Sequence, residues 1–543
     1  MRAYTLLLTT AATSYLLCKV QAQELSSFSN ELLETLNSFS SSDPETSSLS
    51  TVVQNSSDVI NEISKHGGKR SLQSPLSSQV ACQLLNILFP DCYTDSRTNQ
   101  SAYDILQEKN WSKSCDLPAA CFLTPEHPVQ VAVALQVISK LHSKFAVRSA
   151  GHNPNPGFAG VGQDGITIDT QLFQTLELSA DKAIATIGAG LRFGAVQGFL
   201  DSQGVAVVSG RNLNVGVSGL ILGGGHPIIN SLTGLVADNI KSMEIVLSNF
   251  RVVKASLTEN PDLFRALKGG GNNFGIVTKF EAYTNMPRNI WYRNVVYDSS
   301  NPRAIFDAFV EVQRNMEKDP KAGIQMSCGP ASFIVAFVYG EHTTNPIVFA
   351  PFDRFVPTAE RTPPTNGTTL EFIQLQSPPQ SELNSRDTVG VTTLLDTDLY
   401  LDIYNQYLTT TSANNNTSAA FLLSIQTFGT AATQVAQRNG GNALGTSQRA
   451  QTWRNPIAEW SNSADDAQVH SALLQIGDYI KVQSQAKGLY DPFIFANVAA
   501  HNQNVLASYG WKNLNFLRGV SRRYDPTGVF QRLQNGGFLV SRS

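Results

Sequence analysis

The chain has 543 residues, with 40 Lys and Arg against 43 Asp and Glu and a formal net charge of −3. This length is about three times that of a common domain, so we expect two or three folded units and exclude a disulfide miniprotein. Only 15% of the residues are charged and no long basic run occurs, so neither a nucleic-acid partner nor membrane docking is expected.

The first residues have the pattern of a secretory signal peptide. Met1 and Arg2 precede an apolar, hydroxyl-rich run from Tyr4 to Leu17, and the segment ends on Val20-Gln21-Ala22, a small-x-small cleavage pattern. A membrane anchor, the alternative, needs about 20 strongly apolar residues, and this run is shorter and interrupted by Thr and Ser. We therefore expect a signal peptide at 1–22 and a secreted or vesicular protein.

Asn-x-Ser/Thr triplets agree with secretion because they accept N-linked glycans in that compartment. Such triplets also arise by chance, so they are supporting signals only. The triplets begin at Asn55, Asn99, Asn110, Asn366, Asn415 and Asn416.

Four clustered cysteines predict a disulfide brace. Cys18 lies in the signal segment and Cys328 stands alone, whereas the other four fall within forty residues of one another. Four cysteines allow three pairings, and the sequence does not choose among them. Their spacings fit no common zinc pattern, so no metal site is expected. The clustered cysteines are Cys82, Cys92, Cys115 and Cys121.

Residues 23–75 are rich in Ser, Asn, Glu and Thr and poor in aromatic residues. Such a composition buries little apolar surface, so a flexible leader is predicted. Near its end, Lys69-Arg70 is either a site for dibasic cleavage in the secretory pathway or a solvated pair on a loop.

Regular elements begin after the cysteine cluster. Thr124-Pro125-Glu126 is a helix start, and the apolar run from Val129 to Leu141 continues that helix. Phe145 to Ser149 reads as a short strand that enters a loop of Gly and Pro at 150–157.

Strands and helices alternate irregularly in the next hundred residues. Strands are expected at 166–169 and 183–187, a helix near 194–202, and a hairpin from Ser242 to Leu247 and Arg251 to Ala255. We therefore predict an α+β fold.

Two glycine clusters, Gly188–Gly194 and Gly269–Gly275, have three residues rather than two before the last glycine, which disfavours a Rossmann fingerprint. No P-loop, Gly-x-Ser-x-Gly or His-Glu-x-x-His motif is found. Glycine does let backbone N–H groups approach an anion, and the loop Arg148-Ser-Ala-Gly-His152 combines that property with a cation and a hydroxyl.

Further motifs follow that loop in order along the chain. They are Gly188-Ala-Gly-Leu-Arg-Phe193, the segment from Gly210 to Gly225, Asp238-Asn239, Gly269-Gly-Gly-Asn-Asn-Phe-Gly-Ile-Val277 and Tyr524-Asp-Pro-Thr-Gly-Val-Phe530. The ordered set closely resembles the berberine bridge enzyme-like branch of FAD-linked oxidases, which share the vanillyl-alcohol-oxidase, or PCMH-type, flavin fold. The match covers about 112–285 and 491–530.

The resemblance implies that His152 bonds covalently to the flavin 8α carbon. Ala150 replaces the first of two glycines usual in that loop, which is harmless only if its φ and ψ are ordinary. His226 is expected to be a pocket or core residue. The resemblance assigns FAD binding to Arg148, Ser149, Ala150, Gly151, His152, Asn153, Val215, Gly216, Ser218, Gly219, Ile276, Val277 and Asn497.

Two positions refine this expectation. Asn212 stands where many relatives carry a second, cysteinyl flavin bond, so a single covalent bond is implied. Val215 stands where a bulkier side chain closes the oxygen route in relatives, so its size favours an oxidase.

The resemblance leaves the catalytic base unassigned. Plant-like members follow the asparagine matched by Asn497 with a tyrosine, and Val498 here carries no proton. Acid and phenol candidates occur further upstream, although each is more simply read as solvated or structural. The base candidates are Asp396, Asp398, Tyr400 and Tyr404.

The expected organisation is a FAD-binding domain at 76–286, a substrate domain of antiparallel sheet and helices at 287–489, and a C-terminal return to the first domain at 490–543. The implied function is a secreted oxidase that transfers hydride from an alcohol or secondary metabolite to covalent FAD and then passes electrons to dioxygen, giving hydrogen peroxide. The alternatives are a flavin dehydrogenase with another acceptor, a carbohydrate oxidase, or a non-catalytic secreted glycoprotein.

Overall fold

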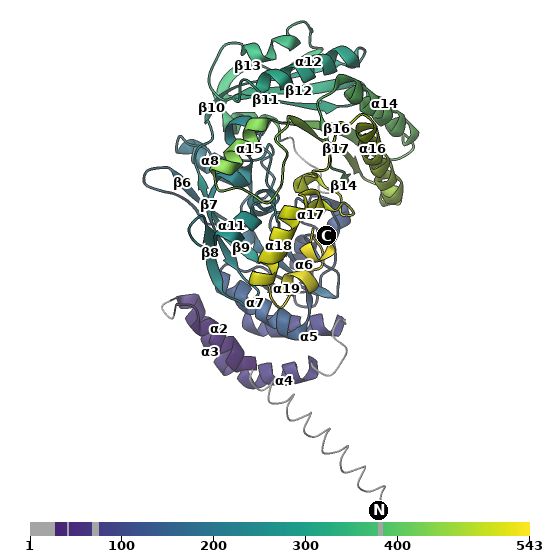
Figure 1. The fold of residues 1–543 in the computed structure, drawn as a ribbon. Coiled ribbons are helices and arrows are strands. Elements are labelled where there is room, and N and C mark those ends of the chain that lie inside the picture. Colours follow the sequence, from purple (N-terminus) through teal and green to yellow (C-terminus); the bar gives the residue numbers. More distant parts are fainter. Residues whose placement is uncertain (1–27, 41–42, 68–74, 378–383) are drawn as a thin grey trace, which may run out of the picture.

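The computed structural model describes residues 28–40, 43–67, 75–377 and 384–543, which form three sheets and the helices around them (Figure 1). Mixed strands and helices confirm the predicted α+β class. The predicted signal peptide and the Lys69-Arg70 pair lie outside the described residues. Among the described helices, none has the length and apolarity needed to cross a bilayer.

The predicted flexible leader is wrong for residues 28–40 and 43–67, most of which lie in helices. Phe28, Leu32 and Leu36 are spaced four residues apart and are fully buried, so they form one apolar stripe that the polar average composition concealed. Lys140 pairs with Glu31 at 2.9 Å and ties this layer to the main body. The helices are α2 (Phe28–Asn37), α3 (Pro44–Asn55) and α4 (Ser57–Gly67).

A four-stranded sheet has the order β1-β2-β4-β3, with β3 and β4 parallel to one another. Helix α5 (Pro75–Leu88) precedes the strands of this sheet, and α7 (Pro128–Leu141) connects β2 to β3. Helix α7 begins at Pro128, three residues after the predicted proline, because His127 adopts the extended N-cap conformation. The strands are β1 (Tyr93–Thr94), β2 (Cys121–Leu123), β3 (Lys144–Arg148) and β4 (Gly165–Asp169).

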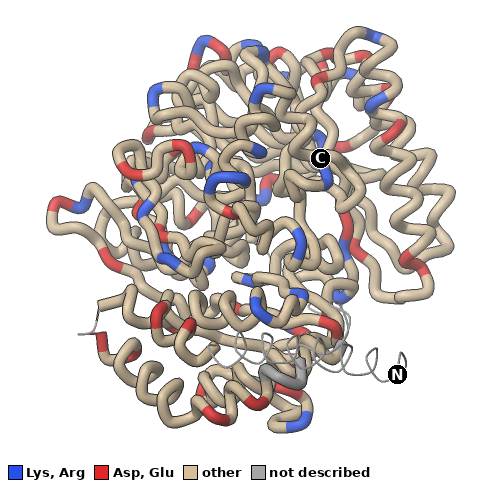
Figure 2. The backbone as a smooth tube through the Cα atoms, turned by 60° about the horizontal axis from the view of Figure 1, so that its bottom comes forward, with Lys and Arg blue, Asp and Glu red and all other residues tan. Residues whose placement is uncertain are grey.

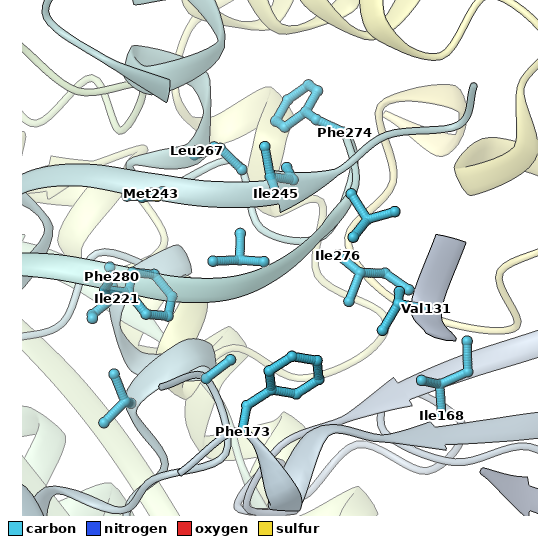
Figure 3. Close-up of a cluster of buried hydrophobic side chains, with 14 of the residues drawn as sticks. Val131, Ile168, Phe173, Ile221, Met243, Ile245, Leu267, Phe274, Ile276 and Phe280 are labelled. Atoms are coloured by element: carbon cyan, nitrogen blue, oxygen red, sulfur yellow. The ribbon is translucent and has the colours of Figure 1, made fainter. Parts of the chain in front are cut away.

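A five-stranded sheet has the order β5-β6-β9-β7-β8 and contains the predicted hairpin as β7 and β8. It shares a core with the four-stranded sheet, where Val131, Ile168 and Ile276 are buried (Figure 3). The strands are β5 (Leu176–Leu178), β6 (Ile184–Gly188), β7 (Ile240–Val246), β8 (Val252–Ser256) and β9 (Ile276–Tyr283).

A nine-stranded antiparallel sheet contains every described strand between 289 and 491. The helices α12 (Pro302–Met316), α14 (Thr397–Ala413) and α16 (Asp466–Ala486) pack on one of its faces (Figure 1). The strands are β10 (Asn289–Asp298), β11 (Ala322–Cys328), β12 (Ser332–Tyr339), β13 (Ala359–Thr368), β14 (Ser385–Thr388), β15 (Val391–Leu394), β16 (Ala420–Phe428), β17 (Gln451–Trp460) and β18 (Tyr490–Asp491).

The C-terminal segment returns to the two smaller sheets. The amide of Phe145 in β3 donates to the carbonyl of Leu533 at 3.0 Å, and the amide of Asn535 donates back to Phe145 at 2.8 Å. The helices of this segment are α17 (Val505–Ser508), α18 (Trp511–Tyr524) and α19 (Val529–Arg532). The remaining helices are α6 (Gln100–Gln107), α8 (Phe193–Ser202), α9 (Val217–Leu222), α10 (Asn230–Thr233), α11 (Pro261–Leu267), α13 (Thr369–Leu375) and α15 (Thr430–Arg438).

The predicted disulfide brace involves only two of the four clustered cysteines. Cys82 in α5 is bonded to Cys121 in β2. Cys92 and Cys115 are buried free thiols, and burial raises the pKa of each to about 12. One cross-link therefore joins the α5 helix to the four-stranded sheet.

The structure contradicts glycosylation at Asn110. This side chain is 2% exposed, and its amide nitrogen donates to the Cys115 carbonyl and to Asp116, each at 3.1 Å. A glycan on that nitrogen would need the same buried space. The other predicted acceptors, Asn55, Asn99, Asn366, Asn415 and Asn416, are exposed.

Acidic and basic residues are interspersed along the described chain (Figure 2). Most of the ion pairs join partly exposed side chains, such as Lys321 with Glu341 at 2.6 Å. Such pairs contribute little to stability individually. The buried pair of Arg148 and Asp169 is a clear exception, and it lies beside the site described next.

Candidate functional site

A cavity of about 540 Å³ is bordered by the two smaller sheets, the C-terminal segment and the inner face of the nine-stranded sheet. This volume is within the range of small-molecule and cofactor pockets. One wall is formed by the loops that follow β3 and precede α9 and β9, and the other by polar residues of the large sheet.

The loop after β3 supplies the first part of the wall, from Ser149 to Asn155. Gly151 has φ of +68°, a left-handed conformation that glycine adopts without steric cost. Ala150 is not among the described residues with positive φ, so the departure from glycine there is harmless. The Ser149 hydroxyl donates to the Ala189 carbonyl at 2.7 Å and fixes the loop against the next segment.

Arg148 is not among the described residues that line the cavity. Its guanidinium pairs with Asp169 at 2.8 Å, and both side chains are at most 1% exposed. It also lies over the Phe122 ring, 5.3 Å from the ring centre. Arg148 therefore anchors the base of the loop between β3 and β4 instead of facing a ligand.

His152 lies in the cavity wall, stacked on Trp111. The ring centres are 4.3 Å apart and the planes differ by 12°. The Trp111 backbone amide donates to the Gly151 carbonyl at 2.9 Å. The guanidinium of Arg386, from β14, lies 5.1 Å from the indole centre. Trp111 therefore fixes the orientation of the His152 ring.

The segment before α9 approaches this loop closely. A Cβ on Gly216 would lie 2.6 Å from the Cβ of Ala150, so only glycine fits there. The Ser218 hydroxyl donates to the Ala189 carbonyl at 2.7 Å, the same acceptor that Ser149 uses. Val215, Gly216, Ser218 and Gly219, to which the resemblance assigns FAD binding, all line the cavity.

Asn212 also lines the cavity. Its side-chain oxygen accepts the Asn214 amide at 2.8 Å, which closes a turn over the segment. A carboxamide cannot form the thioether bond that a cysteine at this position would form.

The third part of this wall is the segment from Gly269 to Val277 together with Asn497. The Asn497 amide nitrogen donates to the Gly219 carbonyl at 2.9 Å, and its oxygen accepts the Gly225 amide at 3.0 Å. Asn497 therefore joins the C-terminal segment to the glycine-rich segment around α9. Ile276 and Val277 line the cavity at the start of β9.

The opposite wall is the inner face of the large sheet. In β11, Ile324 and Met326 point into the helix-covered core, whereas Gln325 and Ser327 line the cavity. This is the alternation expected of a strand. Ser424 of β16 and Asn455 of β17 continue the polar surface.

His226 lines the cavity but is a core residue in its contacts. It is 4% exposed, its Nε2 lies 2.9 Å from the Thr427 carbonyl, and its ring lies 5.0 Å from that of Trp453. Burial, aided by the nearby Arg211 charge, lowers the pKa of His226 to about 3. The imidazole is therefore neutral at physiological pH.

The base candidates from the sequence do not lie at the cavity. Tyr400 and Tyr404 belong to the core on the helix-covered face of the sheet, where Tyr400 donates to Gln313 at 2.9 Å and Tyr404 to the Gly329 carbonyl at 2.9 Å. Burial raises the pKa of both phenols. Asp396 caps α14, and Asp398 pairs with exposed Arg303 at 2.7 Å.

Sequence reasoning missed Trp111, Arg211 and the polar residues of the large sheet. Arg211 had a visible signal, since it is a charge inside a segment of small and apolar residues. Among the described lining residues, the titratable side chains are His152, His226 and Arg211, and none is a carboxylate or phenol. The described chain also contains no cluster of three potential metal ligands.

These residues fit a large cofactor held largely by backbone. Side chains are excluded where loops converge, because a Cβ on Gly223 would overlap the Asn497 amide and one on Gly216 would overlap Ala150. Gly271, with φ of +66°, instead borders open space at the cavity. Bare backbone of this kind allows close approach of a pyrophosphate.

Comparisons with known proteins agree with this site. Residues 119–256 match the model of an FAD binding domain. An FAD-dependent monooxygenase of Arthrobotrys oligospora is 37% identical over 468 residues, covering 86% of this chain and 90% of that protein.

Solved structures share the fold. Wild-type BBE-like 1 of Physcomitrella patens has a TM-score of 0.70 at 18% identity, covering 84% of this chain and 99% of that one. Xylooligosaccharide oxidase from Myceliophthora thermophila has a TM-score of 0.69 at 19% identity, with the same coverage of both chains.

Proposed function

Because the chain belongs to a family of FAD-dependent oxidoreductases and shares the fold of a solved BBE-like protein, we propose that it oxidises an alcohol or secondary metabolite with FAD covalently held by His152. Dioxygen is the final electron acceptor in this proposal. The supporting observation is the position of His152, whose ring lies in a cavity between glycine-rich backbone and an amide-lined sheet.

Bound FAD supplies an acceptor for the substrate hydride and, once reduced, passes two electrons to dioxygen to give hydrogen peroxide. The residues of this chain bind and orient the reactants. The loop from Ser149 to Asn153 would hold the pyrophosphate, Ile276 and Val277 the adenine half, and Asn497 the region near the flavin ring.

A single covalent bond follows from the residues at the two relevant positions. The imidazole of His152 is a nucleophile, and the stack with Trp111 limits its rotation. Asn212 offers no thiol for a second attachment. We therefore propose histidyl attachment alone.

Oxygen as acceptor is supported by Val215, whose short side chain lines the cavity. The test is the rate at which air reoxidises photoreduced enzyme. Val215→Leu should slow that rate and Val215→Ala should preserve it, whereas slow reoxidation of the wild-type enzyme would favour a dehydrogenase with another acceptor.

A second candidate activity is monooxygenation, because the 37% identical relative carries that name. An oxidase releases one peroxide per substrate and places no atom of dioxygen in the product. A monooxygenase places one oxygen atom in the product and reduces the other to water, with the two electrons supplied either by an added reductant or by the substrate itself. Turnover under ¹⁸O-labelled dioxygen with peroxide counting separates the two.

Acid precipitation of the purified protein tests covalent attachment. Yellow colour should stay in the wild-type pellet and leave the pellet of His152→Ala. His342→Ala, an exposed histidine outside the cavity, is the matched control and should retain the colour. Release of flavin from the wild-type protein would contradict the assignment.

We also propose entry into the secretory pathway, which rests on the pattern of residues 1–22. Expression of the full chain in a eukaryotic host should place the protein in the medium or in vesicles, with an N-terminus near Gln23. Retention of the intact N-terminus inside the cytoplasm would contradict this proposal.

A further inference from the structure

Arg211 places a fixed positive charge in the cavity wall, between the glycine-rich segment and the large sheet. Its Nη1 donates to Gln325 Oε1 at 2.7 Å, and its Nη2 donates to Gln426 Oε1 at 2.8 Å. Gln426 in turn donates to Asn455 Oδ1 at 2.6 Å, and Gln325 donates to Gln376 Oε1 at 3.3 Å. This amide network fixes the guanidinium without neutralising it.

The charge has no counter-ion in the described part of the chain. None of the ion pairs among described residues includes Arg211, and no described lining residue is a carboxylate. The neighbouring histidine, His226, is neutral. Burial lowers the pKa of Arg211 to about 10, so the group is still charged at physiological pH.

Arg211 is partly buried in the cavity wall. A partly buried charge without a counter-ion still costs free energy, because water solvates the ion better than the protein does. Neutral amide acceptors recover only part of that solvation. The guanidinium has five N–H donors, of which the two glutamine oxygens take two among the described residues. The remaining donors can bind a ligand.

We propose that Arg211 binds an anionic oxygen of the substrate, either a carboxylate or an ionised phenol or enol. This inference rests on the proposed function, because it takes the ligand to be the substrate that shares the cavity with FAD. It narrows the substrate to compounds with an acidic oxygen, which separates them from neutral alcohols and neutral sugars.

Equilibrium binding to the flavin-loaded enzyme tests this inference, with the flavin absorbance as the readout. The probes are benzoate, 4-nitrophenol and the neutral analogue benzamide. The wild-type enzyme should bind at least one anion about tenfold or more tightly than benzamide, since a charge-assisted hydrogen bond is stronger than a neutral one.

The pH dependence identifies the source of the anionic oxygen. A carboxylate site should bind benzoate with constant affinity between about pH 6 and 9, where benzoate and Arg211 keep their charges. A phenol or enol site should bind 4-nitrophenol more tightly as the pH rises through the pKa of the probe itself.

Variants test the residue. Arg211→Gln should weaken anion binding by about 10- to 100-fold and leave benzamide binding almost unchanged. Arg211→Lys should keep part of the affinity because it keeps the charge. Arg303→Gln, which removes an exposed arginine outside the cavity, is the matched control and should bind all three probes as the wild-type enzyme does.

The inference is overturned if the wild-type enzyme binds benzamide as tightly as both anions, a result that needs no variant. It is also overturned if Arg211→Gln keeps full anion affinity, or if that variant fails to hold FAD while folding normally, since the cation would then serve the cofactor. Failure of the covalent assignment to His152 is a separate result. It appears as flavin released by acid from the wild-type protein, and the preference of that protein for anions can still be measured.

Discussion

Ala150 and Gly151 are neighbours in the loop after β3, and their backbone conformations differ. Gly151 needs the left-handed region, with φ of +68°, and faces Asn110, whose Oδ1 would lie 3.0 Å from an added Cβ. Ala150 has no such requirement. The two positions therefore respond differently to the exchange of glycine and alanine.

Gly151→Ala should destabilise the protein by about 1–2 kcal/mol, because an L-residue with a side chain is disfavoured in the left-handed region. It should also reduce the flavin content. Ala150→Gly, the matched exchange, should cost at most about 1 kcal/mol through added freedom of the unfolded chain. Urea unfolding and the flavin-to-protein absorbance ratio measure both effects, and equal losses in the two variants would contradict this account.

A second prediction concerns the buried ion pair of Arg148 and Asp169. Asp169→Asn keeps the shape but leaves the Arg148 charge buried without its partner, so the free energy of unfolding should fall by about 3–5 kcal/mol. Glu341→Gln removes a partner from an exposed pair and should cost about 1 kcal/mol or less. Denaturant midpoints compare the two. A similar small loss in both would show that the buried pair is not an anchor.

Trp111 belongs to the short segment between α6 and β2, and that segment supports the cofactor loop. Its ring contacts His152 and Arg386, so it links the loop to β14 of the large sheet. Trp111, which lies outside the glycine-rich motifs of the sequence, thus fixes the orientation of His152, the proposed attachment residue.

Trp111→Leu should lower the rate of covalent flavin incorporation about two- to tenfold, since an aromatic stack contributes about 0.5–1.5 kcal/mol to ring orientation. The rate is followed as acid-stable flavin formed over time. Trp511→Leu, at a side chain that is 70% exposed, should incorporate flavin at the wild-type rate. An unchanged rate in Trp111→Leu would remove Trp111 from the positioning role.

Helix α16 contacts β14 through a titratable pair. His470 Nδ1 lies within hydrogen-bond distance of Asp387 Oδ2, and this bond raises the pKa of His470. The exposed His501 ring stacks on His470 at 5.4 Å between centres. The attraction to Asp387 is therefore strongest while His470 is protonated.

A raised folded-state pKa means that the pair stabilises the protein fully below the unfolded value of about 6.5 and loses that contribution as the pH rises through the folded value. The stability difference between wild type and His470→Gln should thus be largest at about pH 5.5 and shrink toward pH 8. His342→Gln, outside this contact, should show no such trend. A pH-independent difference for His470→Gln would contradict the assignment.

Across the whole molecule, the residues that the resemblance assigns to FAD lie together along one wall of the cavity, except Arg148, because that wall is built from short local segments. The conformations of Gly151 and Gly271 and the order of the glycine segments depend on short stretches of chain. The hairpin of β7 and β8 likewise lies within two residues of its predicted bounds, because its pattern of β-branched residues around a polar turn is local.

The substrate wall depends on long-range pairing and could not be predicted in the same way. Which face of β11 meets the cavity follows from its pairing with β12 and β16, so Gln325 becomes a lining residue only in the folded sheet. Tyr400 and Tyr404 were base candidates for the same reason. The sequence does not reveal that α14 covers the face of the large sheet that lies away from the cavity. The N-terminal helices were missed because their apolar residues are few but regularly spaced.

Peptide mapping shows whether His152 is the one residue bonded to FAD. Trypsin should release residues 149–182 as one peptide containing His152 and residues 212–241 as another containing Asn212. Mass spectrometry should find the flavin mass on the first peptide only. Unmodified 149–182 peptide from fully yellow protein, or flavin on the 212–241 peptide, would contradict the account.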